Sequence, residues 1–115
     1  MHRRQFMGSV AAGAAAPALL ASPAAKPGDI PKRVFGKTGV PLTIVGQAGG
    51  RFPLCTFEEA KAVTLRAYEL GINYFDNAHS YWDGRSEEVY GAVLPPFRKQ
   101  VFITSKSVKR TTKEA

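Results

Sequence analysis

Residues 72–91 read INYFDNAHSYWDGRSEEVYG, and this stretch decides both the expected fold and the expected place of its chemistry. The apolar run at its start predicts a buried strand, and this strand ends on the carboxylate of Asp76. Tyr81 follows five residues later, and Ser86 is then a candidate N-cap for a helix that carries Glu87 and Glu88 in its first turn. An acid at the end of a core strand either caps a polar loop or belongs to an active site.

The stretch just before it, residues 56–71, reads TFEEAKAVTLRAYELG and predicts a helix. Thr56 and Glu59 have the spacing of a capping box, in which each side chain satisfies a free backbone N–H at the helix start. Gly71 is placed to end the helix, since glycine tolerates a positive φ. Apolar residues recur at spacings of three and four and predict one buried face: Ala60, Val63, Ala67 and Leu70.

Further strands are expected on both sides. Residues 32–46, KRVFGKTGVPLTIVG, have the pattern of a hairpin that leads into a first core strand at 42–45, followed by a glycine-rich loop over 46–50. The helix after Tyr81 should end near Leu94, before two prolines. The run VFITSK at 101–106 predicts a third, fully buried strand, and TTKEA at 111–115 predicts the capped start of another helix.

Strands that alternate with helices indicate a parallel sheet with right-handed crossovers. Two architectures fit this order, an eight-stranded β/α barrel and a doubly wound sheet. A doubly wound dinucleotide fold should carry G-x-G-x-x-G between its first strand and helix, and GQAGGR at 46–51 does not have that spacing. We therefore predict the N-terminal portion of a (β/α)8 barrel, with about three βα units and a leading hairpin.

Composition excludes some classes of function. The net charge is +7, but the positive residues are scattered, so no nucleic-acid-binding tail is indicated. Cys55 is the single cysteine, which excludes an internal disulfide and a cysteine-based metal cluster. We expect Cys55 to be a small packing residue and expect no metal site.

Residues 1–24 differ from the rest of the chain. They have a basic start, an alanine-rich apolar middle and small residues at Ser22 and Ala24, the layout of a signal peptide, and the apolar run is too short for a stable membrane span. Arg3 and Arg4, followed by Phe6, resemble the twin-arginine signal of bacterial export. We predict cleavage after Ala24, a linker over 25–31, and export through the twin-arginine machinery to the periplasm.

In β/α barrels the active site lies at the C-terminal ends of the strands. Asp76 closes the second predicted strand, Tyr81 lies in the loop that follows, and Lys106 closes the third strand. Adjacent parallel strands end at the same edge, so these three groups are expected to converge. His79 is expected to be a loop histidine.

Together these motifs resemble the aldo-keto reductase family. The resemblance rests on the strand–Asp–four residues–Tyr run and the G-x-S-E-x-x-x-G helix start within 71–91, on VFITSK ending in lysine, and on the hairpin at 32–46. It extends from Lys32 to the end of the sequence. It implies an NADP(H)-dependent oxidoreductase that reduces the carbonyl of a small aldehyde or ketone to an alcohol.

The resemblance also implies residue roles. Tyr81 would protonate the carbonyl oxygen as hydride arrives from NADPH, Lys106 would favour the phenolate, and Asp76 would hold Lys106 in place. Trp82 would line the substrate pocket with Tyr81, or simply pack. The cofactor would approach a set of small residues and one acid: Gly46, Ala48, Gly49 and Asp76. Ala48 stands where the family commonly has a second glycine.

Length limits this expectation, because a complete barrel has about 250 residues. We therefore expect residues 32–115 to be the N-terminal part of such a barrel, inactive alone, because the resemblance implies a further catalytic histidine at the end of the next strand. Two alternatives to the reductase are an auxiliary nucleotide-binding module and a non-catalytic fragment.

Overall fold

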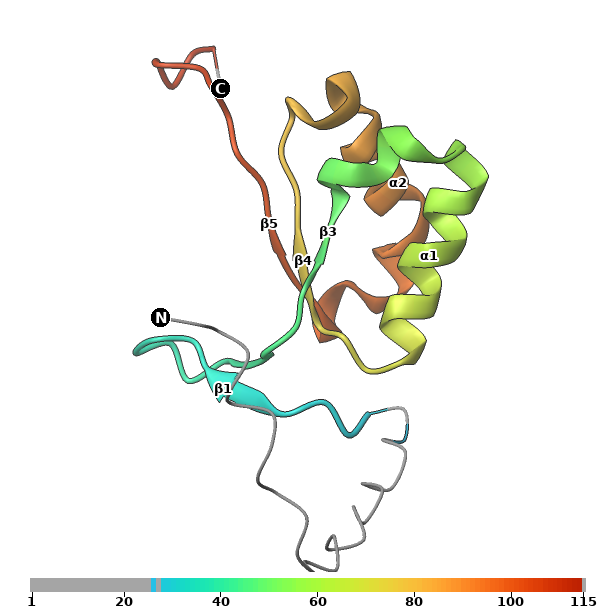
Figure 1. The fold of residues 1–115 in the computed structure, drawn as a ribbon. Helices are drawn as coiled ribbons and strands as arrows, with labels where there is room; N and C mark the ends of the chain where they lie inside the picture. The colour runs from blue at the N-terminus through green and yellow to red at the C-terminus, as the bar shows by residue number, and fades with distance from the viewer. Residues whose placement is uncertain (1–25, 27, 115) are drawn as a thin grey trace, which may run out of the picture.

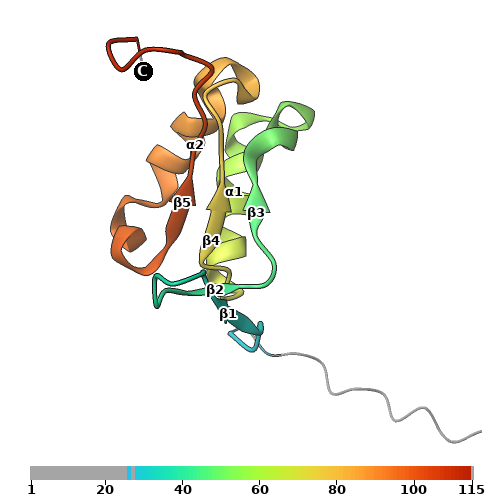
Figure 2. The ribbon, with the colours of Figure 1, turned by 90° about the vertical axis from the view of Figure 1, so that its left-hand side faces the viewer.

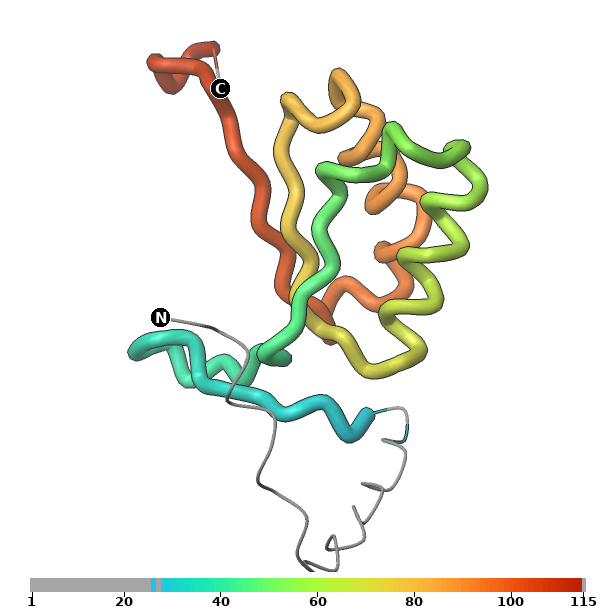
Figure 3. The backbone as a smooth tube through the Cα atoms, in the orientation of Figure 1, coloured from blue at the N-terminus to red at the C-terminus, as the bar shows by residue number. Residues whose placement is uncertain are grey.

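The computed structural model describes residue 26 and residues 28–114. The predicted signal peptide, residues 1–24, lies outside these residues, as do Ala25 and Pro27 of the predicted linker. A two-stranded antiparallel hairpin and a three-stranded parallel sheet follow one another along the chain, and two helices cover the sheet (Figures 1 and 3). Among the described residues, no helix has both the length and the apolar character needed to cross a membrane.

The hairpin consists of β1 (Lys32–Val34) and β2 (Pro41–Thr43), joined by a turn. Gly36 and Gly39 have φ angles of 52° and 74°, which glycine adopts without a steric penalty. The hairpin lies at the N-terminal end of the parallel sheet (Figure 1). The predicted hairpin is confirmed, but the prediction of a core strand at 42–45 is wrong, because two of those four residues belong to β2.

The first parallel strand is instead β3 (Gln47–Ala48), inside the segment predicted to be a glycine-rich loop. It pairs in parallel with β4 (Tyr74–Asp76), and Ala48 lies opposite Asp76. Gly46 allows this pairing, because a Cβ on it would come within 2.6 Å of the Tyr74 ring. The third strand, β5 (Phe102–Thr104), pairs with the other edge of β4 and confirms a strand within 101–106. The prediction that it is fully buried is wrong, because all three residues of β5 are only partly buried, and Ser105 and Lys106 are exposed.

The first helix, α1 (Phe57–Glu69), has the predicted capping box. The Thr56 hydroxyl accepts from the Glu59 N–H at 3.2 Å, and the Glu59 carboxylate accepts from the Thr56 N–H at 2.7 Å. The predicted buried face is partly wrong, since Val63 is 52% exposed and Thr64 is fully buried. Thr64 can be buried because its hydroxyl donates to the Ala60 carbonyl at 2.8 Å and leaves no polar group unpaired.

The second helix, α2 (Arg85–Val93), ends before the two prolines, as predicted, and a 3-10 helix (Pro95–Gln100) follows. Its N-cap is Gly84, with φ 87°, so the prediction of Ser86 as N-cap is wrong. Ser86 is fully buried inside the helix, where its hydroxyl donates to the Gly49 carbonyl at 3.0 Å. The predicted start of a third helix is described only as a turn over residues 112–114.

Both helices pack on the same face of the sheet (Figures 1 and 2). The strands follow in sequential order β3-β4-β5, and the core between the layers is built on Phe75, Tyr90 and Leu94. The Phe75 and Tyr90 rings meet edge to face at 5.6 Å. Sequential parallel strands with every crossover helix on one side form a section of barrel wall.

Candidate active site

The C-terminal edge of the sheet brings the three predicted catalytic residues together. Lys106 is the centre, because its ammonium donates to the Asp76 carboxylate at 2.7 and 2.8 Å and to the Tyr81 hydroxyl at 3.3 Å. The residues come from the end of β4, the loop after it, and the segment after β5. The prediction that they converge is confirmed.

Asp76 owes its position to strand register. It lies opposite Thr104 in the β4–β5 ladder, and the Thr104 hydroxyl donates to Asp76 Oδ1 at 2.6 Å. The hydrogen bond from Lys106, with that from Thr104 second, lowers the pKa of Asp76 below its ordinary value. Asp76 is therefore an ionised acceptor.

The Lys106 ammonium donates hydrogen bonds to acceptors on several sides. Besides Asp76 and Tyr81, it donates to the backbone carbonyl of Asn77 at 2.8 Å. The hydrogen bond to Asp76 raises the pKa of Lys106, and the one to Tyr81 acts in the same direction. A lysine fixed in this way is a positive charge directly beside a phenol oxygen.

Tyr81 is positioned by a close backbone contact and an unusual turn. A Cβ on Gly50 would lie 3.5 Å from Tyr81 Cζ, so the ring rests on the Gly50 backbone. The next three residues all have positive φ: Trp82 at 54°, Asp83 at 51° and Gly84 at 87°. Non-glycine residues in this region are strained, and such strain often lies at functional sites.

Trp82 packs toward the helices. Its ring lies 6.4 Å from the Phe57 ring, and the guanidinium of Arg85 stacks over it at 4.6 Å. These contacts explain how Trp82 is held in its strained conformation. Its role in a substrate pocket stays a prediction.

The predicted cofactor residues separate into two groups. Ala48 is exposed beside Asp76 at the C-terminal edge, and Gly49 follows it directly. Gly46 precedes β3 and faces Tyr74. A Cβ on Gly49 would collide with the Ser86 hydroxyl, so that glycine is needed for packing between α2 and β3. The cofactor role of all four residues stays a prediction.

Sequence reasoning missed the residues that support this edge. Tyr90 shares its hydroxyl between the carbonyls of Gln47 at 3.0 Å and Asp76 at 3.3 Å, and so joins α2 to two strand ends. Burial raises the pKa of Tyr90, which keeps this hydroxyl a donor. Thr104 could have been found, since a polar residue ends an apolar strand beside Lys106. Tyr90 gives no such signal.

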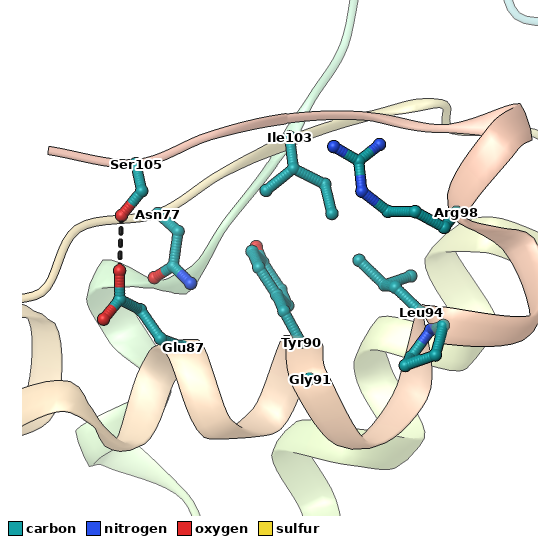
Figure 4. A pocket seen from close by; sticks show the side chains of 9 residues that line it. Asn77, Glu87, Tyr90, Gly91, Leu94, Arg98, Ile103 and Ser105 are labelled. Carbon is teal, nitrogen blue, oxygen red and sulfur yellow. Dashed lines mark hydrogen bonds between the residues drawn. The ribbon is translucent and has the colours of Figure 1, made fainter.

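Two of the hollows near the site are lined by both Glu87 and Ser105. One, of about 520 Å³, lies between α2 and β5 and is lined by Tyr90, Leu94, Arg98 and Ile103 among others (Figure 4). The second, of about 430 Å³, reaches Lys106 and is lined by His79 and Glu87 as well. Within the described part of the chain, no cluster of three or more histidine, cysteine or acidic residues is arranged to hold a metal ion.

The sequence profile of the aldo/keto reductase family matches residues 46–115. This chain belongs to that family. The matched residues include Asp76, Tyr81 and Lys106, the three residues that converge at the C-terminal edge of the sheet.

Relatives and solved structures agree with this assignment. The aldo/keto reductase chain is 31% identical over 87 residues to pyridoxal 4-dehydrogenase of Microbacterium luteolum, covering 72% of this chain and 25% of that protein. It is 34% identical over 90 residues to 7-acetyl-epi-neemfruitin B aldo-keto reductase of Melia azedarach, covering 71% of this chain and 27% of that one. The chain therefore spans about a quarter of the length of these relatives.

A solved structure with a similar fold is also an aldo-keto reductase. The holo form of an aldo-keto reductase from Bacillus halodurans superposes with a TM-score of 0.65 over 75% of this chain and 28% of that one, at 24% identity. The predicted (β/α)8 architecture is thus confirmed for the portion that the chain contains.

Proposed function

We propose that the protein is an NADP(H)-dependent oxidoreductase that reduces aldehyde or ketone carbonyls to alcohols. The observation that carries this proposal is the chain of contacts from Asp76 through Lys106 to the Tyr81 hydroxyl. A phenol is a useful proton donor at neutral pH only where the phenolate left behind is stabilised. An ammonium 3.3 Å away supplies that stabilisation.

The residues divide the work between them. Tyr81 would donate its proton to the carbonyl oxygen, and the Lys106 ammonium would stabilise the resulting phenolate. Asp76 keeps Lys106 charged and in place, and Thr104 orients Asp76. When bound, the nicotinamide cofactor supplies the hydride, and the protein supplies orientation and the proton.

The C-terminal edge suits a flat cofactor ring. Ala48 is small and exposed beside Asp76, and the Tyr81 ring already rests on the bare backbone of Gly50. Small residues allow a ring to approach the backbone closely. Ala48 and Asp76 would therefore contact the nicotinamide end, with Gly49 behind them.

The test uses the full-length protein with NADPH and an aromatic aldehyde, and also with NADP⁺ and the alcohol, because one relative is named a dehydrogenase and another a reductase. Tyr81→Phe should lower kcat by about 10²–10⁴-fold. Tyr68→Phe is the matched control, since Tyr68 stacks on Phe97 away from the site. Cofactor binding without turnover in the unmodified protein would instead favour the auxiliary nucleotide-binding module.

We also propose export to the periplasm through the twin-arginine pathway, on the strength of Arg3, Arg4 and Phe6. This pathway would let the protein fold around its cofactor in the cytoplasm, where NADPH is made. Replacing both arginines by lysine should leave the protein in the cytoplasmic fraction. Equal periplasmic amounts of both forms would contradict the proposal.

A further inference from the structure

Glu87 joins the two segments that carry the catalytic residues. Its Oε1 accepts from the Ser105 hydroxyl at 2.6 Å, and its Oε2 lies 3.1 Å from His79 Nδ1. Figure 4 shows the first contact beside the hollow between α2 and β5. The sequence alone marked Glu87 only as a helix-start charge, like its neighbour Glu88.

The partners of Glu87 are close to the catalytic residues along the chain. Ser105 directly precedes Lys106, and His79 lies two residues before Tyr81. The backbones of these segments are already joined, because the His79 N–H donates to the Lys106 carbonyl at 3.1 Å. The Tyr81 segment is also joined to the start of α2, because the Arg85 N–H donates to the Tyr81 and Trp82 carbonyls. Among the described residues, no backbone hydrogen bond joins the Ser105 and Lys106 segment to α2. Glu87 supplies that connection.

Tyr81 depends on this connection more than Lys106 does. Lys106 is bound to Asp76 on β4 by two short hydrogen bonds, whereas its bond to the Tyr81 hydroxyl is longer, at 3.3 Å. Tyr81 is flanked by His79 on one side and by the left-handed turn into α2 on the other. Its distance from Lys106 is therefore set by how α2 sits against the two segments.

We propose that Glu87 is a positioning residue, which sets the separation of the Tyr81 hydroxyl and the Lys106 ammonium by tying α2 to His79 and Ser105. This inference rests on the proposed reductase function for its kinetic consequence, but its structural consequence can be measured without it. Hydrogen bonds from Ser105 and from His79 lower the pKa of Glu87, which agrees with an ionised carboxylate that accepts on both oxygens.

The effect should appear in geometry more than in stability. The Glu87 side chain is 39% exposed and that of His79 is 70% exposed, and contacts this close to solvent contribute little to the free energy of unfolding. Catalysis is more sensitive, because a misplacement of about 1 Å can cost about a hundredfold in rate.

The kinetic test compares Glu87→Ala with Glu88→Ala in the full-length protein. Glu88 is the matched control, because it lies exposed in the same helical turn, and its side chain has no hydrogen bond or ion pair within the described residues. Glu87→Ala should lower kcat by about ten- to a hundredfold with the aldehyde KM nearly unchanged. Glu87→Gln should retain more activity, because its amide oxygen still accepts from Ser105. Equal kcat losses in Glu87→Ala and Glu88→Ala, or no loss in either, would overturn the proposal.

Amide hydrogen exchange gives a readout that needs no turnover. In Glu87→Ala, the peptide over residues 77–84 should exchange faster than in the unmodified protein, by about tenfold at the His79 amide, while the peptide over α1 should not change. Glu88→Ala should match the unmodified protein in both peptides. Unchanged exchange over 77–84 overturns the role of Glu87 even if the protein reduces aldehydes. Faster exchange in a protein without turnover supports that role and removes the reductase proposal alone.

Discussion

The two edges of the parallel sheet belong to the same strands, but different kinds of polar side chain lie at them. At the N-terminal edge, neutral groups hold the hairpin: Asn73 Oδ1 accepts from the Thr43 N–H at 2.8 Å, and Asn73 Nδ2 donates to the Pro41 carbonyl at 2.9 Å. At the C-terminal edge, three residues further along the chain, Asp76 at the end of β4 holds a charged lysine.

The difference indicates how this fold separates tasks. At the N-terminal edge, the Asn73 amide is hydrogen-bonded and aromatic rings pack together, such as those of Phe35 and Phe102 at 5.4 Å. The C-terminal edge holds fixed charges and non-glycine residues with positive φ. Such residues cost free energy of folding and are concentrated at functional sites. We therefore expect changes at the first edge to alter stability and changes at the second edge to alter turnover.

The largest effect should come from Lys106→Met, which removes the charge beside Tyr81. We expect kcat to fall by about a thousandfold, because the phenolate is no longer stabilised. Because Lys106 is half-exposed, the urea midpoint should change little. Lys99→Met is the control, in an exposed part of the 3-10 helix. A large loss of stability with normal kcat in Lys106→Met would contradict the assignment of turnover to the C-terminal edge.

Next in size is Asn73→Ala at the opposite edge. Thr43 is buried, and its N–H would lose its acceptor, so the free energy of unfolding should fall by about 1–3 kcal/mol. Urea unfolding would measure this loss. Tyr81 and Lys106 lie at the other end of the strands, so kcat should stay nearly normal. A fall in kcat comparable to that of Lys106→Met would contradict the division of stability and turnover between the two edges.

A smaller effect should distinguish Trp82→Gly from Trp82→Ala. Both variants lose the contacts with Phe57 and Arg85, but only glycine relieves the positive φ of 54°. Trp82→Gly should therefore be the more stable variant by about 1 kcal/mol in thermal or urea unfolding. The reverse order would mean that this turn is not strained.

The smallest effect should be a pH dependence of stability. The pKa of Asp76 is lowered in the folded protein, so its carboxylate stabilises the fold above its unfolded value of about 4 and ceases to do so as the pH falls through the folded value. The pKa of Lys106 is raised, so its contribution is present below about 10.4 and is lost as the pH rises further.

Unfolding of the unmodified protein and of Asp76→Asn, measured from pH 3 to 11, would test both signs. The difference in stability should be constant near neutrality and shrink toward each extreme. A difference that grows below about pH 4 would contradict the assigned direction for Asp76.

The convergence of Asp76 and Lys106 could be predicted because it follows from chain order. Asp76 ends β4, and Lys106 lies two residues beyond the end of β5, so the prediction that Lys106 closes its strand is wrong by two residues. The ends of adjacent parallel strands still meet at one edge, which brings both residues together. The capping box of Thr56 and Glu59 was equally predictable, since it depends only on local spacing.

The errors arose where a tertiary contact overrides a local pattern. β3 has only two residues, and its pairing with β4 depends on the Tyr74 ring lying against Gly46. Ser86 resembles an N-cap, but Gly84 starts the helix and Ser86 bonds Gly49 across 37 positions of the chain. Glu87 and Glu88 are identical in type, and only the folded structure distinguishes them.

The most direct test of the central claim is a single-turnover measurement of NADPH oxidation by an aromatic aldehyde in the full-length protein and its Tyr81→Phe variant. We expect the rate of the chemical step to fall by at least about a hundredfold, with cofactor affinity unchanged. Equal rates in the two proteins would show that the Tyr81 hydroxyl is not the proton donor and would contradict this account.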